Sequence, residues 1–246
     1  MTDALRVLHL LDSLRESGNG GVSATVDLAC SQQALGAEVA VASGGGPFER
    51  LLHSAGVRHY RLPTDALPRQ LRQAGTGLHA LLRETRPDIV HAHSVAPALL
   101  AVAARFGNWF RLVTTVHSEL PWRAGLMAVG ERIIAVSHAG AVALLRRGVP
   151  ATKLRIVRLA PLGSVRWDAS GQSVSGSDPD QPVIMATGEF RGDNGLDVLI
   201  RAFHLIAADA PAARLHIVGD GPERAACETL AASGSGATGS RSTAWR

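Results

Sequence analysis

The chain has 246 residues, of which 46% are hydrophobic and 19% charged, so it can bury a sizeable core. This composition excludes a disordered chain, and no run approaches the roughly 20 apolar residues of a membrane span. The formal net charge is +4 and the pI is about 10.0, because Lys153 is the only lysine and arginine supplies the other bases. We interpret this bias first as codon usage. Aromatic residues make up only 4%, which argues against a nucleic-acid platform of stacked rings.

The N-terminus and the cysteines indicate the cellular compartment. The first residues lead directly into a strand pattern, so no cleavable leader is predicted. Cys30 and Cys227 are far apart and each lies in a helical pattern, which indicates neither a disulfide framework nor a metal cluster. We therefore expect a cytoplasmic protein with buried thiols.

Short apolar runs alternate with longer amphipathic ones along the first two thirds of the chain. Runs rich in Val, Ile and Leu predict strands at 6–11, 38–43, 88–92, 111–116 and 132–137. These strands are apolar on successive residues, so both of their faces must be covered. Between them, apolar residues spaced by three and four predict helices at 22–35, 48–55, 67–84, 95–106 and 138–147. This βαβ alternation predicts an α/β fold with a doubly wound parallel sheet.

The alternation defines a first domain at 1–163 and breaks off in a linker at 164–181 that is rich in Ser, Gly and Asp. A second α/β unit at 182–232 then begins, with strands predicted at 182–186 and 214–218 and helices at 196–208 and 222–232. Two strands and two helices form an incomplete core, so we expect exposed apolar surface and low stability. Residues 233–246 are interpreted as an aberrant, disordered tail.

Candidate site residues follow the predicted strands, because ligands of open parallel sheets bind beyond the carboxyl ends of the strands. The first such loop ends in Gly20 and Gly21, just before a predicted helix, where glycine backbone and helix N–H groups can approach a phosphate or a sugar. The loop lacks the spacing of a dinucleotide or NTPase motif. A flexible connection is an equal alternative.

Three histidines lie at neighbouring strand ends. His91 and His93 flank the end of the strand at 88–92, and His117 follows the strand at 111–116. Neutral imidazoles facing one cleft can hydrogen-bond sugar hydroxyls or transfer protons. For His91 we favour a packed strand histidine, and for His117 a site role. A zinc site is not expected, because no Cys or carboxylate accompanies these histidines at a ligand spacing.

Several motifs in this order resemble glycosyltransferase family 4: the Gly20-Gly21 turn, Arg-Pro-Asp-Ile-Val-His-Ala-His at 86–93, Thr-Val-His at 115–117, Ile-Ala-Val-Ser at 134–137, and the segments 188–203 and 215–224. The resemblance implies a GT-B architecture of two Rossmann-like domains, with an acceptor domain first and a nucleotide-sugar domain second. It also implies retaining transfer of a sugar from a nucleoside diphosphate donor. No cofactor and no metal bound by an Asp-x-Asp motif are implied.

The resemblance also assigns roles by position. The Gly20-Gly21 turn approaches the donor phosphates or the acceptor, and His117 contacts the transferred sugar as the catalytic candidate. The other positions implied in donor or acceptor binding are His93 and Ser137 in the first domain, and Gly188, Arg191, Gly219 and Gly221 in the second. The expected partners are a nucleotide sugar and a cell-envelope glycan or lipid-linked acceptor.

The chain departs from the family pattern in ways that predict impaired turnover. Glu189 and Asn194 stand where the family commonly has Arg and Lys, leaving Arg191 as the nearby cation for a diphosphate. Leu162-Gly163 replaces the usual Asn-Gly, and the segment that carries the family's pair of glutamates is not found. Another reading frame of the tail can encode a family-like strand, so we predict a C-terminally truncated chain with a frameshift near 233–236.

Other classes remain open from the sequence. A non-catalytic sugar- or nucleotide-binding remnant is one alternative, and a sugar-nucleotide epimerase or oxidoreductase on the same fold class is another. The bases along the amphipathic segment 67–82 suggest peripheral contact with the inner face of a membrane, with an ordinary crossover helix as the alternative.

Overall fold

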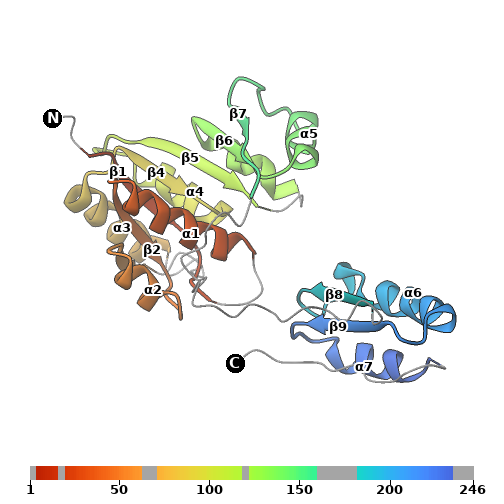
Figure 1. Cartoon of the computed structure of the whole chain (residues 1–246). Coiled ribbons are helices and arrows are strands. Elements are labelled where there is room, and N and C mark those ends of the chain that lie inside the picture. The colour runs from red at the N-terminus through yellow and green to blue at the C-terminus, as the bar shows by residue number, and fades with distance from the viewer. Residues whose placement is uncertain (1–3, 16–19, 63–70, 118–121, 160–181, 235–246) are drawn as a thin grey trace. The chain divides into compact units, whose positions relative to one another are not determined.

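The computed structural model describes residues 4–15, 20–62, 71–117, 122–159 and 182–234. The chain divides into two compact units between residues 168 and 169, and each unit contains its own parallel sheet (Figure 1). Among the described residues, no helix combines the length and the hydrophobicity that crossing a bilayer requires.

The first unit is built on a seven-stranded sheet with the order β3-β2-β1-β4-β5-β6-β7. Every neighbouring pair in it is parallel. The strands are β1 (Arg6–Leu10), β2 (Glu38–Ser43), β3 (Arg58–Arg61), β4 (Ile89–Ala92), β5 (Arg111–Val116), β6 (Arg132–Ala135) and β7 (Leu154–Ile156). The central strands are buried along most of their length, as their continuous apolar runs predict.

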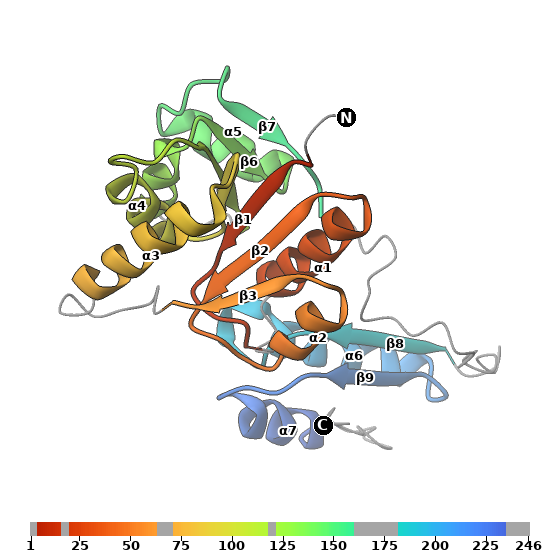
Figure 2. The same cartoon turned by 90° about the vertical axis from the view of Figure 1, so that its left-hand side faces the viewer.

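Helices cover both faces of this sheet (Figure 2). The helical segments are α1 (Gly20–Ala34), α2 (Glu49–Ser54), α3 (Leu71–Thr85), α4 (Val95–Ala103), the 3₁₀ segment η1 (Trp122–Val129) and α5 (His138–Arg146). One core cluster joins α1 and α2 to β2 through residues such as Val26, Val41 and Leu52. A larger cluster joins α3, α4 and α5 to the sheet through residues such as Leu78 and Leu112. The doubly wound parallel sheet predicted from the sequence is therefore confirmed.

The strand order creates a switch point between β1 and β4. From β1 the chain winds outward through β2 to β3, and it then returns through α3 to pair β4 with the other side of β1. Adjacent loops therefore diverge at the carboxyl ends of β1 and β4. Ligands of open parallel sheets bind at this place.

In the first unit, two edge strands and the 3₁₀ segment η1 escaped the sequence analysis. β3 has the sequence Arg-His-Tyr-Arg and β7 has Leu-Arg-Ile, so neither shows the apolar run of a central strand. Both lie at edges of the sheet, where one side of the strand needs no partner. Predicted ends also shift: the strand predicted at 132–137 ends at Ala135, and the helix predicted at 95–106 ends at Ala103. Part of the helix predicted at 67–84 lies outside the described residues.

The second unit contains a two-stranded parallel sheet of β8 (Val183–Thr187) and β9 (Arg214–Val218). The 3₁₀ turn η2 (Gly192–Asn194) and the helices α6 (Leu196–Asp209) and α7 (Arg224–Ala232) complete its described part. A small core gathers around Phe190, Ile200 and Leu215. Met185 is 66% exposed and Val198 64% exposed. The exposed apolar surface predicted for this unit is thus confirmed among its described residues.

Candidate functional site at the strand ends

Four histidine rings meet at the carboxyl ends of β1, β4 and β5. The strand register pairs His9 of β1 with His91 of β4, and His93 follows β4 on the same face as His91. The ring centroids of His91 and His93 are 4.1 Å apart, and those of His93 and His117 are 5.3 Å apart. The structure therefore brings together the three histidines singled out in the sequence, at the switch point of the sheet.

His9 is the member of this cluster that sequence reasoning missed. Its ring is fully buried, and its centroid lies 5.2 Å from those of both His91 and His93. One signal was available, since a histidine in the otherwise apolar run Val-Leu-His-Leu-Leu at 7–11 must find polar partners inside the protein. Only the strand register shows that those partners come from β4 and α1.

Side chains of α1 tie the cluster to the helix. The His9 Nε2 atom lies 2.8 Å from Oε1 of Gln32, and the His9 Nδ1 atom lies 2.9 Å from Nε2 of His93. Thr25 Oγ1 lies 3.0 Å from His93 Nδ1, and the Thr25 hydroxyl donates to the carbonyl of Gly21 at 2.7 Å. Both ring nitrogens of His93 therefore contact protein atoms. This favours a role in which His93 positions neighbouring side chains and does not itself contact a ligand.

Burial holds these imidazoles in their neutral form at pH 7. Desolvation lowers the pKa of His9 to about 4, although the hydrogen bond with Gln32 opposes the shift. The pKa values of His91 and His93 lie well below the usual value, first because the rings are buried and then because neighbouring imidazoles repel a positive charge. Burial also lowers the pKa of His117. Neutral rings can accept hydrogen bonds and bind metal ions.

One ring nitrogen of His117 contacts the cluster, and the other does not. Its Nε2 atom lies 3.0 Å from Nδ1 of His93. Its Nδ1 atom is buried and has no hydrogen-bond partner within the part of the chain that the structure describes. A buried polar atom without a partner is costly, so this nitrogen is suited to a ligand hydroxyl.

Gly20 and Gly21 are the first two residues of α1, so the helix begins two residues earlier than predicted. A Cβ at Gly20 would meet no atom within 4 Å, which leaves open space beside the helix N-terminus. The N-terminal ends of helices carry free N–H groups and partial positive charge, which favour anions.

Ser137 lies two residues beyond β6 and precedes α5. Its Oγ atom accepts a hydrogen bond of 2.9 Å from the backbone N–H of Gly140, and the residue is the N-cap of α5. The structure thus gives Ser137 a capping role at the same edge of the sheet as the histidines.

Replacing Ser137 with alanine should lower the free energy of unfolding by about 1 kcal/mol, because the first turn of α5 loses its cap. Chemical denaturation followed by circular dichroism measures this change. Ser137→Asn, which retains a capping oxygen, is the matched control and should remain close to wild type. An unchanged unfolding midpoint in Ser137→Ala would contradict the capping role.

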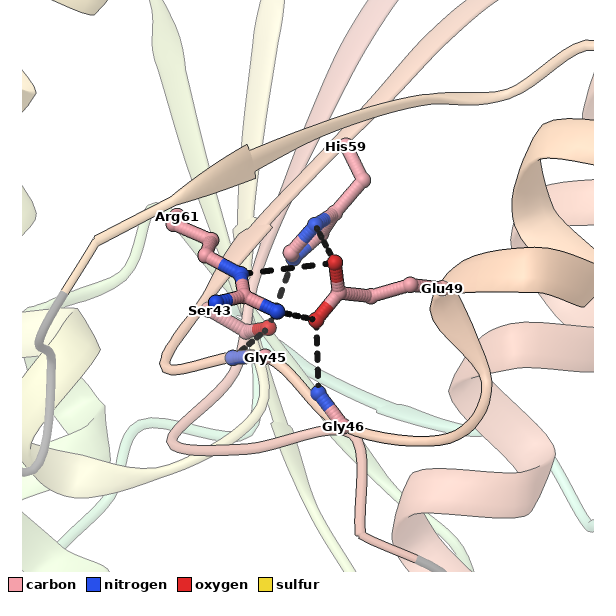
Figure 3. A network of polar contacts seen from close by, with 6 residues as sticks. All are labelled: Ser43, Gly45, Gly46, Glu49, His59 and Arg61. Atoms are coloured by element: carbon pink, nitrogen blue, oxygen red, sulfur yellow. Dashed lines mark hydrogen bonds and ion pairs between the residues drawn. The ribbon is translucent and has the colours of Figure 1, made fainter.

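The glycine-rich loop after β2 carries a second polar network at this edge (Figure 3). The Glu49 carboxylate accepts hydrogen bonds from the Gly46 N–H at 2.9 Å and from Arg61 at 3.0 Å, and lies 3.5 Å from Nδ1 of His59. Ser43 Oγ accepts from the Gly45 N–H at 3.1 Å and contacts His59 at 2.9 Å. Gly45, Gly46 and Arg61 also line a cavity of about 520 Å³ together with Ser13 and Arg15.

Glu49 should titrate below its usual pKa of 4.5, because the Gly46 N–H and then the Arg61 guanidinium favour the charged carboxylate. Its contribution to the folded state is present above the unfolded pKa and is lost as the pH falls through the lowered folded value. A pH titration of the Glu49 carboxyl and the Gly46 amide by NMR measures both. Glu49→Gln should remove this titration from the Gly46 amide. A midpoint at or above 4.5 would exclude the predicted stabilisation of the carboxylate.

In the second unit, the two strand-end loops interlock around Phe190. The Gly188 N–H donates to the Val218 carbonyl at 3.0 Å, and the Phe190 N–H donates to the Asp220 carbonyl at 3.0 Å. A Cβ at Gly219 would lie 1.8 Å from the Gly188 oxygen, and one at Gly221 would lie 2.7 Å from backbone atoms of Phe190. The structure therefore brings the predicted residues Gly188, Gly219 and Gly221 into close backbone contact.

The charges around these loops are mainly acidic. Arg191 is the one basic residue of the segment 188–195, and its guanidinium lies 4.0 Å from the Glu189 carboxylate. Arg224 pairs with Asp220 and Glu228. A diphosphate at these loops therefore meets little uncompensated positive charge.

A doubly wound sheet with polar side chains at its switch point, followed by a second parallel unit with glycine-rich strand ends, matches the GT-B fold of solved glycosyltransferases. The family model Glycosyltransferase Family 4 matches residues 18–159, and the model Glycosyl transferases group 1 matches residues 181–243. The chain belongs to glycosyltransferase family 4. The resemblance inferred from the motifs is thereby confirmed.

Solved structures support the fold at low sequence identity. A glycosyltransferase from Rickettsia africae is 18% identical with a TM-score of 0.73, covering 99% of this chain and 69% of its own. HepE from Anabaena, in complex with UDP and glucose, is 16% identical with a TM-score of 0.75, covering 98% of this chain and 70% of its own. The UDP-GlcNAc 2-epimerase of Neisseria meningitidis is 17% identical with a TM-score of 0.59, covering 94% and 71%. No curated protein matches the chain in sequence.

Proposed function

We propose that the chain transfers a sugar, with retention of configuration, from a nucleoside diphosphate sugar to a hydroxyl of a cell-envelope glycan or glycolipid. The observation that carries the proposal is the buried Nδ1 atom of His117, which lacks a partner among the described residues at the switch point of a family 4 sheet. A sugar hydroxyl or a reacting oxygen supplies the missing hydrogen bond.

The remaining residues of the first unit have supporting roles in this proposal. His93 holds His117 through the 3.0 Å contact between their rings. Gly20 and Gly21 present helix N–H groups to the donor phosphates or the acceptor. Ser137 caps α5 at the same edge, so that binding at its loop depends on that cap.

The second unit supplies the nucleotide site. Gly188, Gly219 and Gly221 keep backbone atoms close enough to approach the nucleotide, and Arg191 is the cation for the diphosphate. HepE is described in complex with UDP and with UDP-glucose, which makes UDP-sugars the first donors to test. In this proposal the transfer requires neither a cofactor nor a metal held by an Asp-x-Asp motif.

Donor binding and turnover are measured separately on the full chain. Isothermal titration calorimetry with UDP and a panel of UDP- and GDP-sugars measures binding, and release of free nucleoside diphosphate in the presence of glycan acceptors measures transfer. His117→Ala should lower the rate of release by about a hundredfold or more. His53→Ala, which changes an exposed residue of α2, is the control. Release that is equal in both variants would exclude His117 from the reaction.

Two alternatives give different products in the same assay. An epimerase is favoured by the likeness to UDP-GlcNAc 2-epimerases, and it would convert UDP-GlcNAc into an isomer without an acceptor. A binding module would show donor binding without either product. Free nucleoside diphosphate that depends on an acceptor supports the transferase.

We further propose that the reaction takes place at the cytoplasmic face of a membrane that holds a lipid-linked acceptor. The bases of the segment 67–82, whose described part belongs to α3, support peripheral contact. Co-sedimentation with vesicles containing anionic lipid tests this contact. Recovery of the chain in the supernatant at low salt would contradict it.

A further inference from the structure

Three of the clustered histidines converge on one point inside the first unit. One ring nitrogen from each of His9, His91 and His93 lies within 4.8 Å of the other two. His9 and His91 are register partners on adjacent strands, and His93, the residue after β4, is separated from His91 by one residue. The strands themselves therefore hold the three rings in place.

The outer nitrogens of two of these rings face oxygen atoms that can accept a hydrogen bond. His9 Nε2 faces Oε1 of Gln32 at 2.8 Å, and an amide oxygen only accepts. His93 Nδ1 faces Thr25 Oγ1 at 3.0 Å, and Thr25 already gives its single proton to the Gly21 carbonyl. His93 Nδ1 also lies 3.0 Å from His117 Nε2, and it donates to Thr25 in the tautomer in which His117 Nε2 accepts. In that tautomer the inner nitrogens, His9 Nδ1 and His93 Nε2, are left with lone pairs.

Those two inner nitrogens lie only 2.9 Å apart. Two lone pairs repel each other at that distance unless a proton or a metal ion lies between them. Without an ion, a proton on His93 Nε2 lies between them, and both rings stay neutral while His93 Nδ1 accepts from His117 Nε2. A metal ion instead takes a lone pair from each ring, because the neutral imidazole is the form of histidine that binds metals.

His91 completes the set. Its Nε2 atom lies 2.7 Å from Thr115 Oγ1, so its Nδ1 atom is the nitrogen left for an ion. Each of the three rings then has its other nitrogen hydrogen-bonded to an oxygen, from Gln32, Thr115 or Thr25. Such outer partners fix the tautomer and orientation of metal-ligating histidines in known sites.

We propose that His9, His91 and His93 form a binding site for a divalent transition-metal ion of the zinc type. Three imidazoles with a fourth position left for another ligand are a known zinc arrangement. The ion joins the carboxyl ends of β1 and β4 and, through Gln32 and Thr25, the helix α1. The inference departs from the sequence expectation, which compared spacings along the chain and did not include His9.

The site also reaches the candidate catalytic residue. His93 Nδ1 lies 3.0 Å from His117 Nε2, so an ion on the opposite nitrogen of His93 fixes the ring against which His117 rests. The ion has a positioning role here and takes no part in sugar transfer. Its presence is therefore measured without any assay of activity.

The test uses the full chain after treatment with a chelator and dialysis. Zn²⁺ titrated by calorimetry should bind with a stoichiometry of one per chain and should raise the thermal unfolding midpoint. Co²⁺ should give the visible absorption of a nitrogen-ligated ion. Gln32→Leu removes one outer partner and should weaken Zn²⁺ binding by about 10- to 100-fold. His53→Gln, which changes an exposed histidine of α2, should bind as wild type does.

His9→Gln should abolish stoichiometric binding, with circular dichroism as the check that the variant folds. If it does not fold, the wild-type titration and Gln32→Leu decide the question. Absence of Zn²⁺ binding by the wild-type chain would overturn the proposal. Binding that is equal in wild type, Gln32→Leu and a folded His9→Gln would also overturn it, because the ion would then occupy other ligands.

Discussion

Replacing Gly219 with alanine is expected to disrupt the second unit while leaving the first unit folded. The added Cβ would lie 1.8 Å from the Gly188 carbonyl oxygen, which is a backbone atom and cannot rotate away. The ends of β8 and β9 must therefore separate. That movement breaks the hydrogen bonds from the Phe190 N–H to Asp220 and from the Glu223 N–H to the Phe190 carbonyl, both 3.0 Å long.

The expected loss is about 3 kcal/mol or more, from overpacking together with the lost hydrogen bonds. Phe190 is 3% exposed and belongs to a small cluster, so the second unit has little stability in reserve. Native-state hydrogen exchange, measured by amide NMR, should show loss of protection at β8 and β9 alone. Binding of UDP should be lost in the same variant.

Gly20→Ala is the control variant for Gly219→Ala. It shows whether the loss of stability comes from the steric clash at Gly219 or from replacing any glycine with alanine. A Cβ at Gly20 meets nothing within 4 Å, so this variant should fold as wild type does. Retained protection of β8 and β9 in Gly219→Ala would contradict the interlocked arrangement of the strand-end loops.

Much of the fold could be predicted from the pattern of apolar residues. Strands that are buried on both faces appear in the sequence as short, continuous apolar runs. The runs that became β1, β2 and β5 were visible for this reason. Edge strands lack that constraint. In β3 all four residues are polar or aromatic, and only pairing with β2 makes them a strand.

The candidate site was predictable only where a residue directly follows a strand. His93 and His117 could be placed at strand ends by counting residues along the chain. His9 could not be joined to them from the sequence. Only the order of strands in the sheet brings β1 beside β4, which begins at Ile89, 79 residues after Leu10. Tertiary contacts such as Gln32 with His9 depend on how α1 packs, which periodicity alone does not determine.

The double variant Glu189→Arg and Asn194→Lys is expected to strengthen binding of UDP by about tenfold or more. These are the residue types that the family resemblance implies at the two positions. In this chain the Glu189 carboxylate lies 4.0 Å from the Arg191 guanidinium, and the Asn194 side chain donates to the Glu189 carbonyl at 2.7 Å. The first change removes a negative charge beside Arg191, and both add donors for phosphate oxygens.

Charge-assisted hydrogen bonds contribute about 1.5 to 3 kcal/mol each, and exposure of these side chains reduces that figure by solvent screening. The single variant Glu189→Arg changes the charge by two units, and the double variant changes it by three. Asp209→Arg, which also changes the charge by two units, is the control for a nonspecific effect of charge in Glu189→Arg alone. Asp209 ends α6, whose first residue, Leu196, follows the loop, so about 20 Å of helix separates the control from the site. Calorimetric titration with UDP at low and high salt should show tighter binding only in the loop variants. Equal gains in Asp209→Arg would mean that the diphosphate responds to net charge and does not contact the loop after β8.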